Sequence, residues 1–208
     1  MNSSKFCNYL KRFFDLFFII PLIILVMPLI ILFIILIYLE DKSNPFYFQK
    51  RVGYLGKHFT IFKLRTMTNK KIEIDHNKYY CFEEDPRITN IGKFLRKYSF
   101  DEFPQFFNVL IGDMSLVGPR PPIHDELDYE TIDDINMPII NERKKVKPGI
   151  TGYAQVKSRN DLTWNQKLEL DKQYLSFKPF KRLFVDFRIL SLTFAEIFNS
   201  KGIYDKKV

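Results

Sequence analysis

The sequence predicts an α+β fold: a small, mostly helical domain with a short β-hairpin, an N-terminal re-entrant membrane helix and amphipathic helices at the membrane interface. Residues 16–39 contain no charged side chain. Residues 44–67 alternate polar and apolar side chains around glycines, which is typical of two strands joined by a turn. Later segments repeat apolar residues at helical spacing. We therefore expect an anchor in residues 1–40 and a globular domain in residues 41–208.

Size and charge limit the class of protein. A chain of 208 residues accommodates one ordinary domain with an appendage. A net charge of +8 favours an anionic partner, which can be nucleic acid, an anionic lipid surface or a phosphate-bearing substrate. Cys7 and Cys81 form no CxxC motif and the three histidines are not clustered, so neither a disulfide framework nor a zinc site is indicated. A reducing, cytoplasmic setting is expected.

The apolar segment 16–39 is long enough to cross a bilayer core, which needs about 20 residues. It is too long for a signal-peptide core and has no small-residue cleavage site. Pro21 and Pro28 lie inside it and predict a break or kink near Met27. Its flanks are both basic, with Lys5, Lys11 and Arg12 before it and Lys42, Lys50 and Arg51 after it. Because positive charge is retained on the cytoplasmic side, we expect a re-entrant helix with both ends inside; the alternative is a kinked transmembrane helix.

Charged residues at the entry to this segment are predicted to anchor it. Arg12 and Asp15 are three positions apart, so the two side chains can pair on one helix face. A buried aspartate at the interface needs such a partner. We interpret Lys11, Arg12 and Asp15, together with the predicted bend at Met27 and Pro28, as membrane-anchoring residues.

The hairpin and the segment after it carry the first candidate site residues. Lys63 and Arg65 are predicted on one face of the second strand, where they can be either solvated or functional. Asp85-Pro86 predicts a turn leading into a short helix, because Ile88, Ile91 and Leu95 have helical spacing. Residues 68–84 are polar and predict a loop.

The stretch 96–121 is the predicted working centre. Ser99 and Glu102 fit a capping box, so a helix should begin at about Phe100. Asp101 would then lie in the first helical turn, where free N–H groups favour an anion, with Arg96 just outside. Residues 99–102 alone also fit an ordinary helix start.

Arg120 lies between Pro119 and Pro121, which restrict the backbone and present the guanidinium for bidentate phosphate binding. The acidic run 125–134 predicts a solvated helix or loop without a metal. Residues 147–160 are rich in turns, and their glycines let the backbone approach a ligand.

The two C-terminal segments predict helices. Thr163–Tyr174 has the composition of a polar helix. Residues 178–198 mix aromatic and basic side chains, which fits either a helix in the headgroup plane or a core helix.

Assembled, these blocks resemble the bacterial sugar transferase family, the monotopic phosphoglycosyl transferases, in its minimal form of about 200 residues. The matching blocks are Lys11-Arg12-x-x-Asp15, Pro45-Phe46-Tyr47-Phe48-Gln49, Arg51-Val52-Gly53, Phe62-Lys63-x-Arg65-Thr66-Met67, Asp85-Pro86-Arg87, Gly92-Lys93-Phe94-Leu95-Arg96-Lys97, Ser99-x-Asp101-Glu102-x-Pro104-Gln105, Asn108-Val109-Leu110, Gly112-Asp113-Met114-Ser115-Leu116-Val117-Gly118-Pro119-Arg120-Pro121 and Lys147-Pro148-Gly149-Ile150-Thr151-Gly152. Met27-Pro28 departs from the family's usual Ser-Pro, so we expect a bend that is shallower or supported by Pro21.

The resemblance implies that Asp101 is the nucleophile, which attacks the sugar-bearing phosphate of a UDP-sugar, releases UMP and holds an aspartyl phosphosugar until undecaprenyl phosphate takes it. Glu102 completes the dyad, and both carboxylates would bind Mg²⁺ with the phosphates. Phosphate or uridine contacts are implied for Arg96, Lys63, Arg65, Arg120 and Arg159, with Pro119 and Pro121 shaping the loop.

The resemblance also implies partners and location: a UDP-sugar, undecaprenyl phosphate and membrane lipids, not nucleic acid, with the catalytic domain on the cytoplasmic face of the bacterial inner membrane. The reaction would initiate an O-antigen, capsule, exopolysaccharide or glycoprotein glycan. The sugar and a homodimer stay open. Two alternatives remain: a metal-dependent nucleotide-sugar hydrolase with the same dyad, and a non-enzymatic, membrane-tethered basic module.

Overall fold

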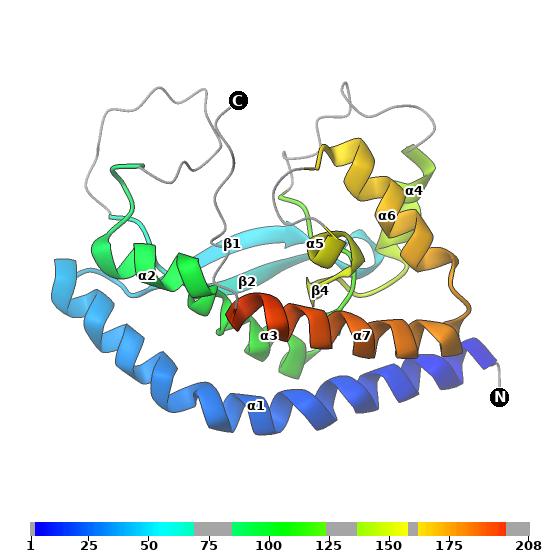
Figure 1. The fold of residues 1–208 in the computed structure, drawn as a ribbon, viewed down its shortest axis with the longest axis horizontal. Coiled ribbons are helices and arrows are strands. Elements are labelled where there is room, and N and C mark those ends of the chain that lie inside the picture. The colour runs from blue at the N-terminus through cyan, green and yellow to red at the C-terminus, as the bar shows by residue number, and fades with distance from the viewer. Residues whose placement is uncertain (1–2, 69–84, 124–136, 158–161, 199–208) are drawn as a thin grey trace.

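The computed structural model describes residues 3–68, 85–123, 137–157 and 162–198. Arg159, the acidic run 125–134 and nearly all of the predicted loop 68–84 lie outside these ranges. Within them the fold is α+β, as predicted, and it is dominated by helices (Figure 1).

Helix α1 (Ser3–Asp41) is one continuous helix that passes through both prolines. The predicted break or kink near Met27 therefore takes the form of a bend in an unbroken helix (Figure 1). Pro21 and Pro28 are two helical turns apart and both are exposed, so they share the outer face. A proline ring displaces the carbonyl one turn before it and opens the helix on its own side. That places the inside of the bend against the rest of the protein.

One stripe of α1 is buried and the remainder is apolar but exposed. The buried residues of the stripe are Asp15, Ile19, Ile23, Val26, Ile30, Phe33 and Ile37. Phe17, Ile24 and Leu25 on the other faces are exposed to 60%, 71% and 73%. By length and composition α1 can cross a membrane. Its outer surface therefore suits lipid, while its stripe joins the protein core.

Two small sheets hold the chain beside α1. Strands β1 (Phe46–Val52) and β2 (His58–Leu64) form the predicted antiparallel hairpin, in register from Phe46 opposite Leu64 to Val52 opposite His58. Strand β3 (Ser115–Val117) pairs in parallel with β4 (Gly149–Thr151). The second sheet joins segments that are far apart in the sequence, which the sequence analysis did not predict.

The remaining helices are short except for the last two. They are α2 (Asn90–Tyr98), α3 (Gln105–Ile111), α4 (Met137–Lys144), α5 (Tyr153–Lys157), α6 (Trp164–Ser176) and α7 (Pro179–Phe198). The predicted short helix after Asp85-Pro86, the polar helix and the C-terminal helix correspond to α2, α6 and α7. Thr163 caps α6 with Gln166 in a reciprocal capping box.

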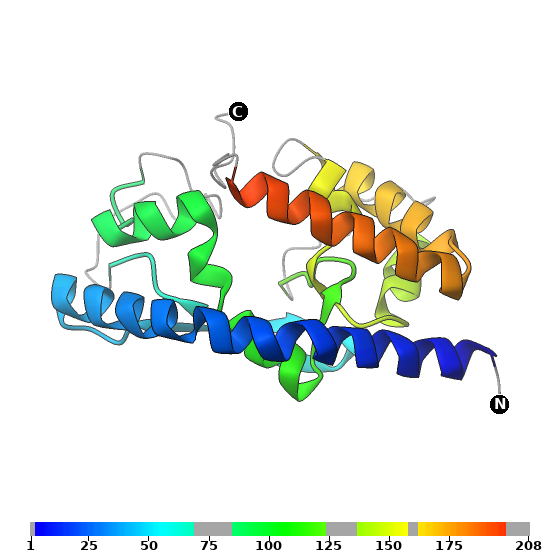
Figure 2. The same cartoon turned by 60° about the horizontal axis from the view of Figure 1, so that its bottom comes forward.

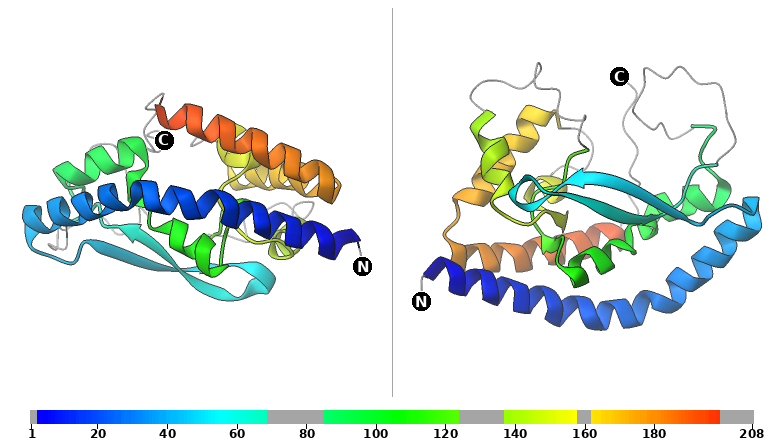
Figure 3. Two further views of the ribbon diagram at one scale, coloured as in Figure 1. Left: turned by 90° about the horizontal axis from the view of Figure 1, so that it is seen from below. Right: turned by 180° about the vertical axis from the view of Figure 1, so that it is seen from behind.

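Helix α1 runs along the whole lower side of the molecule (Figure 2). Seen from below, it lies between α7 and the hairpin (Figure 3). Its middle joins a core with Val109 of α3, Leu116 of β3 and Ile189 of α7. Near its end, Phe33 and Ile37 pack with Leu64 of β2 and Leu95 of α2. The anchor and the globular part therefore share their hydrophobic core.

Candidate active site

Asp101 lies on a single 3-10 turn, Phe100–Glu102, between α2 and α3. The predicted capping box is wrong. Ser99 has φ 58° and its side chain caps nothing; its backbone N–H instead closes α2 by donating to the carbonyls of Arg96 and Leu95. The regular helix begins only at Gln105. Asp101 is thus held on a short 3-10 turn that follows α2 directly, and it does not lie at the N-terminus of an α-helix.

The Asp101 side chain is buried, with 8% of the residue exposed. Its Oδ1 has no hydrogen-bond partner among the described residues. Burial raises the pKa of Asp101 to about 6; the charge of Lys63 opposes this, that of Glu102 adds to it and that of Arg96 opposes it. A buried carboxylate with a raised pKa and an unpaired oxygen is a candidate nucleophile or metal ligand.

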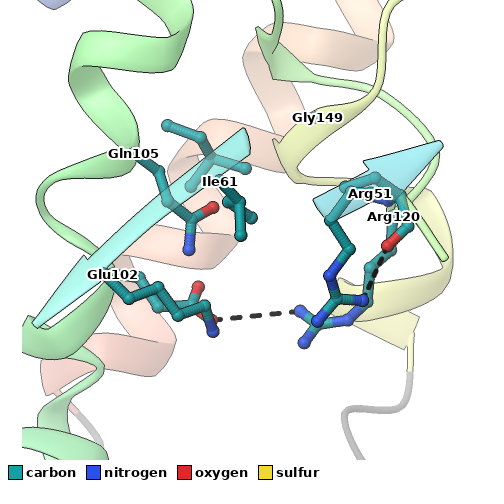
Figure 4. Close-up of a pocket in the computed structure, with 9 residues that line it drawn as sticks. Arg51, Ile61, Glu102, Gln105, Arg120 and Gly149 are labelled. Carbon is teal, nitrogen blue, oxygen red and sulfur yellow. Dashed lines mark hydrogen bonds and ion pairs between the residues drawn. The ribbon is translucent and has the colours of Figure 1, made fainter. Parts of the chain in front are cut away.

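Glu102 faces the predicted cations across a small pocket. Its Oε1 accepts from Lys63 Nζ at 2.8 Å and lies 4.0 Å from a guanidinium nitrogen of Arg120. Figure 4 shows the Glu102 and Arg120 side chains pointing toward one another. The pocket encloses about 220 Å³ of empty space, part of which is open to solvent. Its lining is Arg51, Ile61, Lys63, Glu102, Gln105, Arg120, Pro121, Gly149 and Ile150.

The second sheet positions Arg120. Gly118 comes directly after β3 and packs against the backbone that leads into β4. A Cβ at Gly118 would lie 2.4 Å from the Lys147 carbonyl oxygen. The Pro119 carbonyl then accepts from the N–H of Gly149 at 3.1 Å, and the Arg120 carbonyl accepts from Arg143 at 2.6 Å. The backbone around Arg120 is therefore fixed while its side chain stays exposed to the pocket.

Arg96 and Arg65 differ in their surroundings. Arg96 Nε donates to Thr66 Oγ1 at 2.8 Å, and its charge acts on Asp101. Arg65 lies just past β2 and forms a two-pronged pair with Asp41, with nitrogen-oxygen distances of 2.7 and 2.5 Å. The structure therefore brings Lys63, Arg96 and Arg120 to the Asp101–Glu102 pair and engages Arg65 elsewhere. Arg159 lies outside the described residues.

Arg51 and Gln105 line the pocket although the sequence analysis did not assign them to the site. Arg51 is 6% exposed and donates to the Pro121 carbonyl at 3.0 Å and to Gln49 Oε1 at 2.7 Å. It thus ties the hairpin to the Pro-Arg-Pro loop. Both residues occur inside the matching sequence blocks, which was the available signal.

The anchor residues pair differently from the prediction. Arg12 donates to the carbonyls of Val109 and Leu110 at the end of α3, at 2.6 and 2.9 Å. Asp15 pairs with Lys11 at 3.5 Å rather than with Arg12, so the predicted Arg12–Asp15 pair is wrong. Asp15 also accepts from Ser115 Oγ at 3.0 Å and from the Leu116 N–H at 3.2 Å.

Lys11 extends this network to α7, where it pairs with Asp186 at 2.8 Å. Tyr174 of α6 donates to the same carboxylate at 2.7 Å. At the predicted bend, Met27 is partly buried and packs against the main core, whereas Pro28 is exposed. The predicted anchor residues thus fasten α1 to three elements of the globular part.

The described residues contain no group of three or more side chains suited to hold a metal on their own. Glu102, which lines the pocket, and its buried neighbour Asp101 are the candidate carboxylates for a cation among the described residues. Mg²⁺ is commonly held by one or two carboxylates together with substrate phosphates. The free Asp101 oxygen fits such a site.

The family model described as "Bacterial sugar transferase" matches residues 6–200. The chain is 41% identical over 194 residues to the "Uncharacterized sugar transferase EpsL" of Bacillus subtilis, covering 93% of this chain and 90% of EpsL. It is 36% identical over 220 residues to the undecaprenyl-phosphate galactose phosphotransferase of Salmonella typhimurium, covering 97% of this chain and 43% of that protein.

The chain is also 34% identical over 202 residues to the UDP-glucose:undecaprenyl-phosphate glucose-1-phosphate transferase of Escherichia coli, covering 94% of this chain and 41% of that protein. It thus spans nearly all of EpsL and less than half of the two longer relatives.

Proposed function

Because the chain belongs to the bacterial sugar transferase family, we propose that it is a phosphoglycosyl transferase that moves a sugar 1-phosphate from a UDP-sugar to undecaprenyl phosphate and releases UMP. Two relatives that are similar over nearly the whole chain are named as an undecaprenyl-phosphate galactose phosphotransferase and a UDP-glucose:undecaprenyl-phosphate glucose-1-phosphate transferase. The observation that carries the proposal is the buried Asp101 beside Lys63 and Arg96, with one carboxylate oxygen free.

In the proposed reaction, an Asp101 oxygen attacks the phosphorus that bears the sugar. The bond from this phosphorus to the bridging oxygen breaks, UMP leaves with that oxygen, and an aspartyl phosphosugar forms. An oxygen of undecaprenyl phosphate then attacks the same phosphorus and frees the Asp101 carboxylate. Each step exchanges one phosphorus–oxygen bond for another, so the reaction needs no further co-reactant.

The neighbouring cations neutralise the charge of the donor. A carboxylate approaching a diphosphate is repelled unless positive groups lie at the phosphates. Lys63, Arg96 and Arg120 occupy that position around the dyad. The side chains of Arg51, Lys63 and Arg120 line the pocket, so we assign the pocket to the phosphates.

We also propose that Asp101 and Glu102 hold Mg²⁺ together with donor phosphate oxygens. The ion would supply Lewis-acid neutralisation of phosphate charge. In this proposal the side chains around Glu102 orient the donor. Lys63 fixes the Glu102 carboxylate by a hydrogen bond, and Arg120 faces the same carboxylate from the fixed loop.

The names of the similar proteins include both galactose and glucose transferases. We propose only that the product is a polyprenyl-linked sugar that starts glycan assembly. We place the reaction at the cytoplasmic face of the inner membrane, where a soluble nucleotide sugar can meet a lipid phosphate.

Release of UMP from a panel of UDP-sugars tests this function, with and without undecaprenyl phosphate. A transferase releases at most one UMP per enzyme without the lipid and turns over with it; a hydrolase turns over in both cases. Asp101→Asn should abolish release, whereas Glu169→Gln, which alters an exposed carboxylate on α6, should not. Normal turnover by Asp101→Asn would refute the nucleophile assignment.

A further inference from the structure

Arg65 and Thr66 follow β2 and lie between the end of α1 and Arg96. The Arg65 guanidinium is buried and grips both oxygens of Asp41, the last residue of α1, at 2.7 and 2.5 Å. This pair holds the pKa of Asp41 below its usual value, chiefly through the Arg65 hydrogen bonds. A two-pronged arginine–carboxylate pair fixes the direction of both side chains. If the Arg65 guanidinium bound a phosphate instead, Asp41 would lose this partner.

Thr66 continues the connection toward the site. The residue is 6% exposed, and its hydroxyl accepts from Arg96 Nε at 2.8 Å. Its carbonyl accepts from the N–H of Thr89 at 3.1 Å and touches Gly92, where a Cβ would lie 2.1 Å away. Thr66 therefore holds both the start of α2 and the guanidinium at its other end.

The end of α1 also forms direct hydrogen bonds with α2. The Glu40 carboxylate accepts from the backbone N–H groups of Asn90 and Ile91 at 2.8 and 3.3 Å, in the first turn of α2. Behind these contacts, Ile37 packs in one cluster with Leu64 and Leu95. The end of α1, the end of β2 and α2 are thus fixed to one another by charge, backbone bonds and packing.

We propose that Arg65 and Thr66 are positioning residues, through which the end of the membrane helix fixes the direction of the Arg96 guanidinium beside Asp101. The inference rests on the proposed function, and it assigns Arg65 a role other than the substrate contact expected from the sequence. Arg96 remains the residue that meets the donor phosphate.

The first test is a double-mutant cycle between Thr66 and Arg96. Thr66→Val removes the acceptor without changing the side-chain shape and should lower kcat/KM for the UDP-sugar at least about tenfold, as loss of a charge-assisted hydrogen bond does. Thr66→Ser keeps the hydroxyl and should restore most of the rate. In the Arg96→Gln background, Thr66→Val should cause no further loss. Additive losses, or equal losses in Val and Ser variants, would overturn the proposal for Thr66.

The second test separates a positioning Arg65 from a substrate-binding one. Asp41→Asn and Arg65→Gln should lower kcat/KM by the same factor, and the double variant should be no worse than either. KM for undecaprenyl phosphate should stay unchanged. An Arg65→Gln loss that persists in the Asp41→Asn background, with Asp41→Asn itself near wild type, would make Arg65 a substrate contact.

Equilibrium binding of UDP with Mg²⁺ separates failure of this inference from failure of the proposed function. If wild-type protein binds UDP but releases no UMP, the transferase proposal is refuted. A double-mutant cycle that measures UDP affinity still tests whether Thr66 positions Arg96. In that cycle, Thr66→Val and Arg96→Gln should weaken UDP binding non-additively. If the enzyme is active and the two substitutions weaken UDP binding additively, the positioning role of Thr66 is refuted and the transferase proposal stands.

Discussion

At the scale of single residues, Asp101 combines two properties that oppose each other. Its carboxyl group is buried, which disfavours charge, yet the proposed chemistry uses the carboxylate. Lys63 and Arg96 supply the compensating positive charge, and their own positions are fixed by Glu102 and Thr66. Two predictions about Asp101 follow from this balance, one for the rate and one for stability.

The rate should depend on the protonation of Asp101. With a pKa of about 6, the carboxylate dominates above pH 6 and the neutral acid below it. We expect kcat/KM for the UDP-sugar to be flat near pH 7.5 and to fall about tenfold per pH unit well below pH 6. Initial rates of UMP release from pH 5 to 8 measure this. A profile that stays flat down to pH 5 would contradict a titrating Asp101.

Stability should respond to the same group in the opposite sense. The folded pKa of about 6 exceeds the unfolded value near 3.8, so between these values the folded state binds more protons. Stability therefore falls as pH rises from about 4 to 6, and at neutral pH the charge costs on the order of 2–3 kcal/mol.

Asp101→Asn removes that charge. We expect the inactive variant to have a higher Tm than wild type at pH 7.5 and nearly the same Tm at pH 4.5, measured by thermal unfolding in detergent. The exposed Glu169→Gln should leave Tm unchanged at both pH values. A lower Tm for Asp101→Asn at pH 7.5 would mean that the carboxylate is stabilised by contacts stronger than its desolvation.

At the scale of elements, local sequence rules predicted those elements whose interactions are local. The alternating hairpin, the capped helix α6 and the C-terminal helix appear where their patterns indicated. Arg12 was misread because a distant element supplies its partners, and Ser99 was misread because it ends the preceding helix instead of beginning the next one. Ser99 ends α2 in the left-handed region, and Arg12 caps α3 about a hundred residues away. The β3–β4 sheet, which fixes Arg120, likewise joins distant segments and leaves no local signal.

Helix α2 should be sensitive to a single methyl group. A Cβ at Gly92 would lie 2.1 Å from the Thr66 carbonyl oxygen, a backbone atom that cannot move aside. We expect Gly92→Ala to destabilise the protein by more than about 2 kcal/mol and to lower UMP release by displacing Arg96. Thermal unfolding and initial rates measure the two effects.

Gly56→Ala is the matched control for this substitution. A Cβ there meets only the end of the Lys144 side chain at 3.9 Å, and the positive φ of 74° costs about 1 kcal/mol. The control should therefore lose some stability and keep its activity. Equal losses in Gly92→Ala and Gly56→Ala would contradict the close packing of α2 on Thr66.

At the scale of the whole molecule, α1 is bound to the same globular part at both of its ends. Near its start, Lys11 pairs with Asp186 and Arg12 with the end of α3. At its finish, Asp41 pairs with Arg65 and Glu40 with the start of α2. The buried stripe from Ile19 to Ile37 fills the distance between them.

These contacts bear on how α1 sits in the membrane. A helix spanning a hydrocarbon core of about 30 Å would carry its first turns to the far side, away from the globular part. The crossing would break the pairs of Lys11 and Arg12 and expose the buried Asp15, which accepts from Ser115. Asp186 would stay buried in the globular part without its Lys11 partner, and a buried charge without a partner costs several kcal/mol. An α1 that stays beside the domain, with its exposed apolar faces in one leaflet, keeps every contact.

Cysteine labelling in intact cells tests this arrangement. In a Cys7→Ala, Cys81→Ala background, Tyr9→Cys places a thiol at a position that is 72% exposed near the start of α1. We expect a membrane-impermeant maleimide to label it only after the cells are opened, as it should label Glu142→Cys on the globular part. Labelling of Tyr9→Cys but not Glu142→Cys in intact cells would place the two on opposite sides of the membrane. The contacts of Lys11 and Arg12 could then not form, and the spanning alternative would hold.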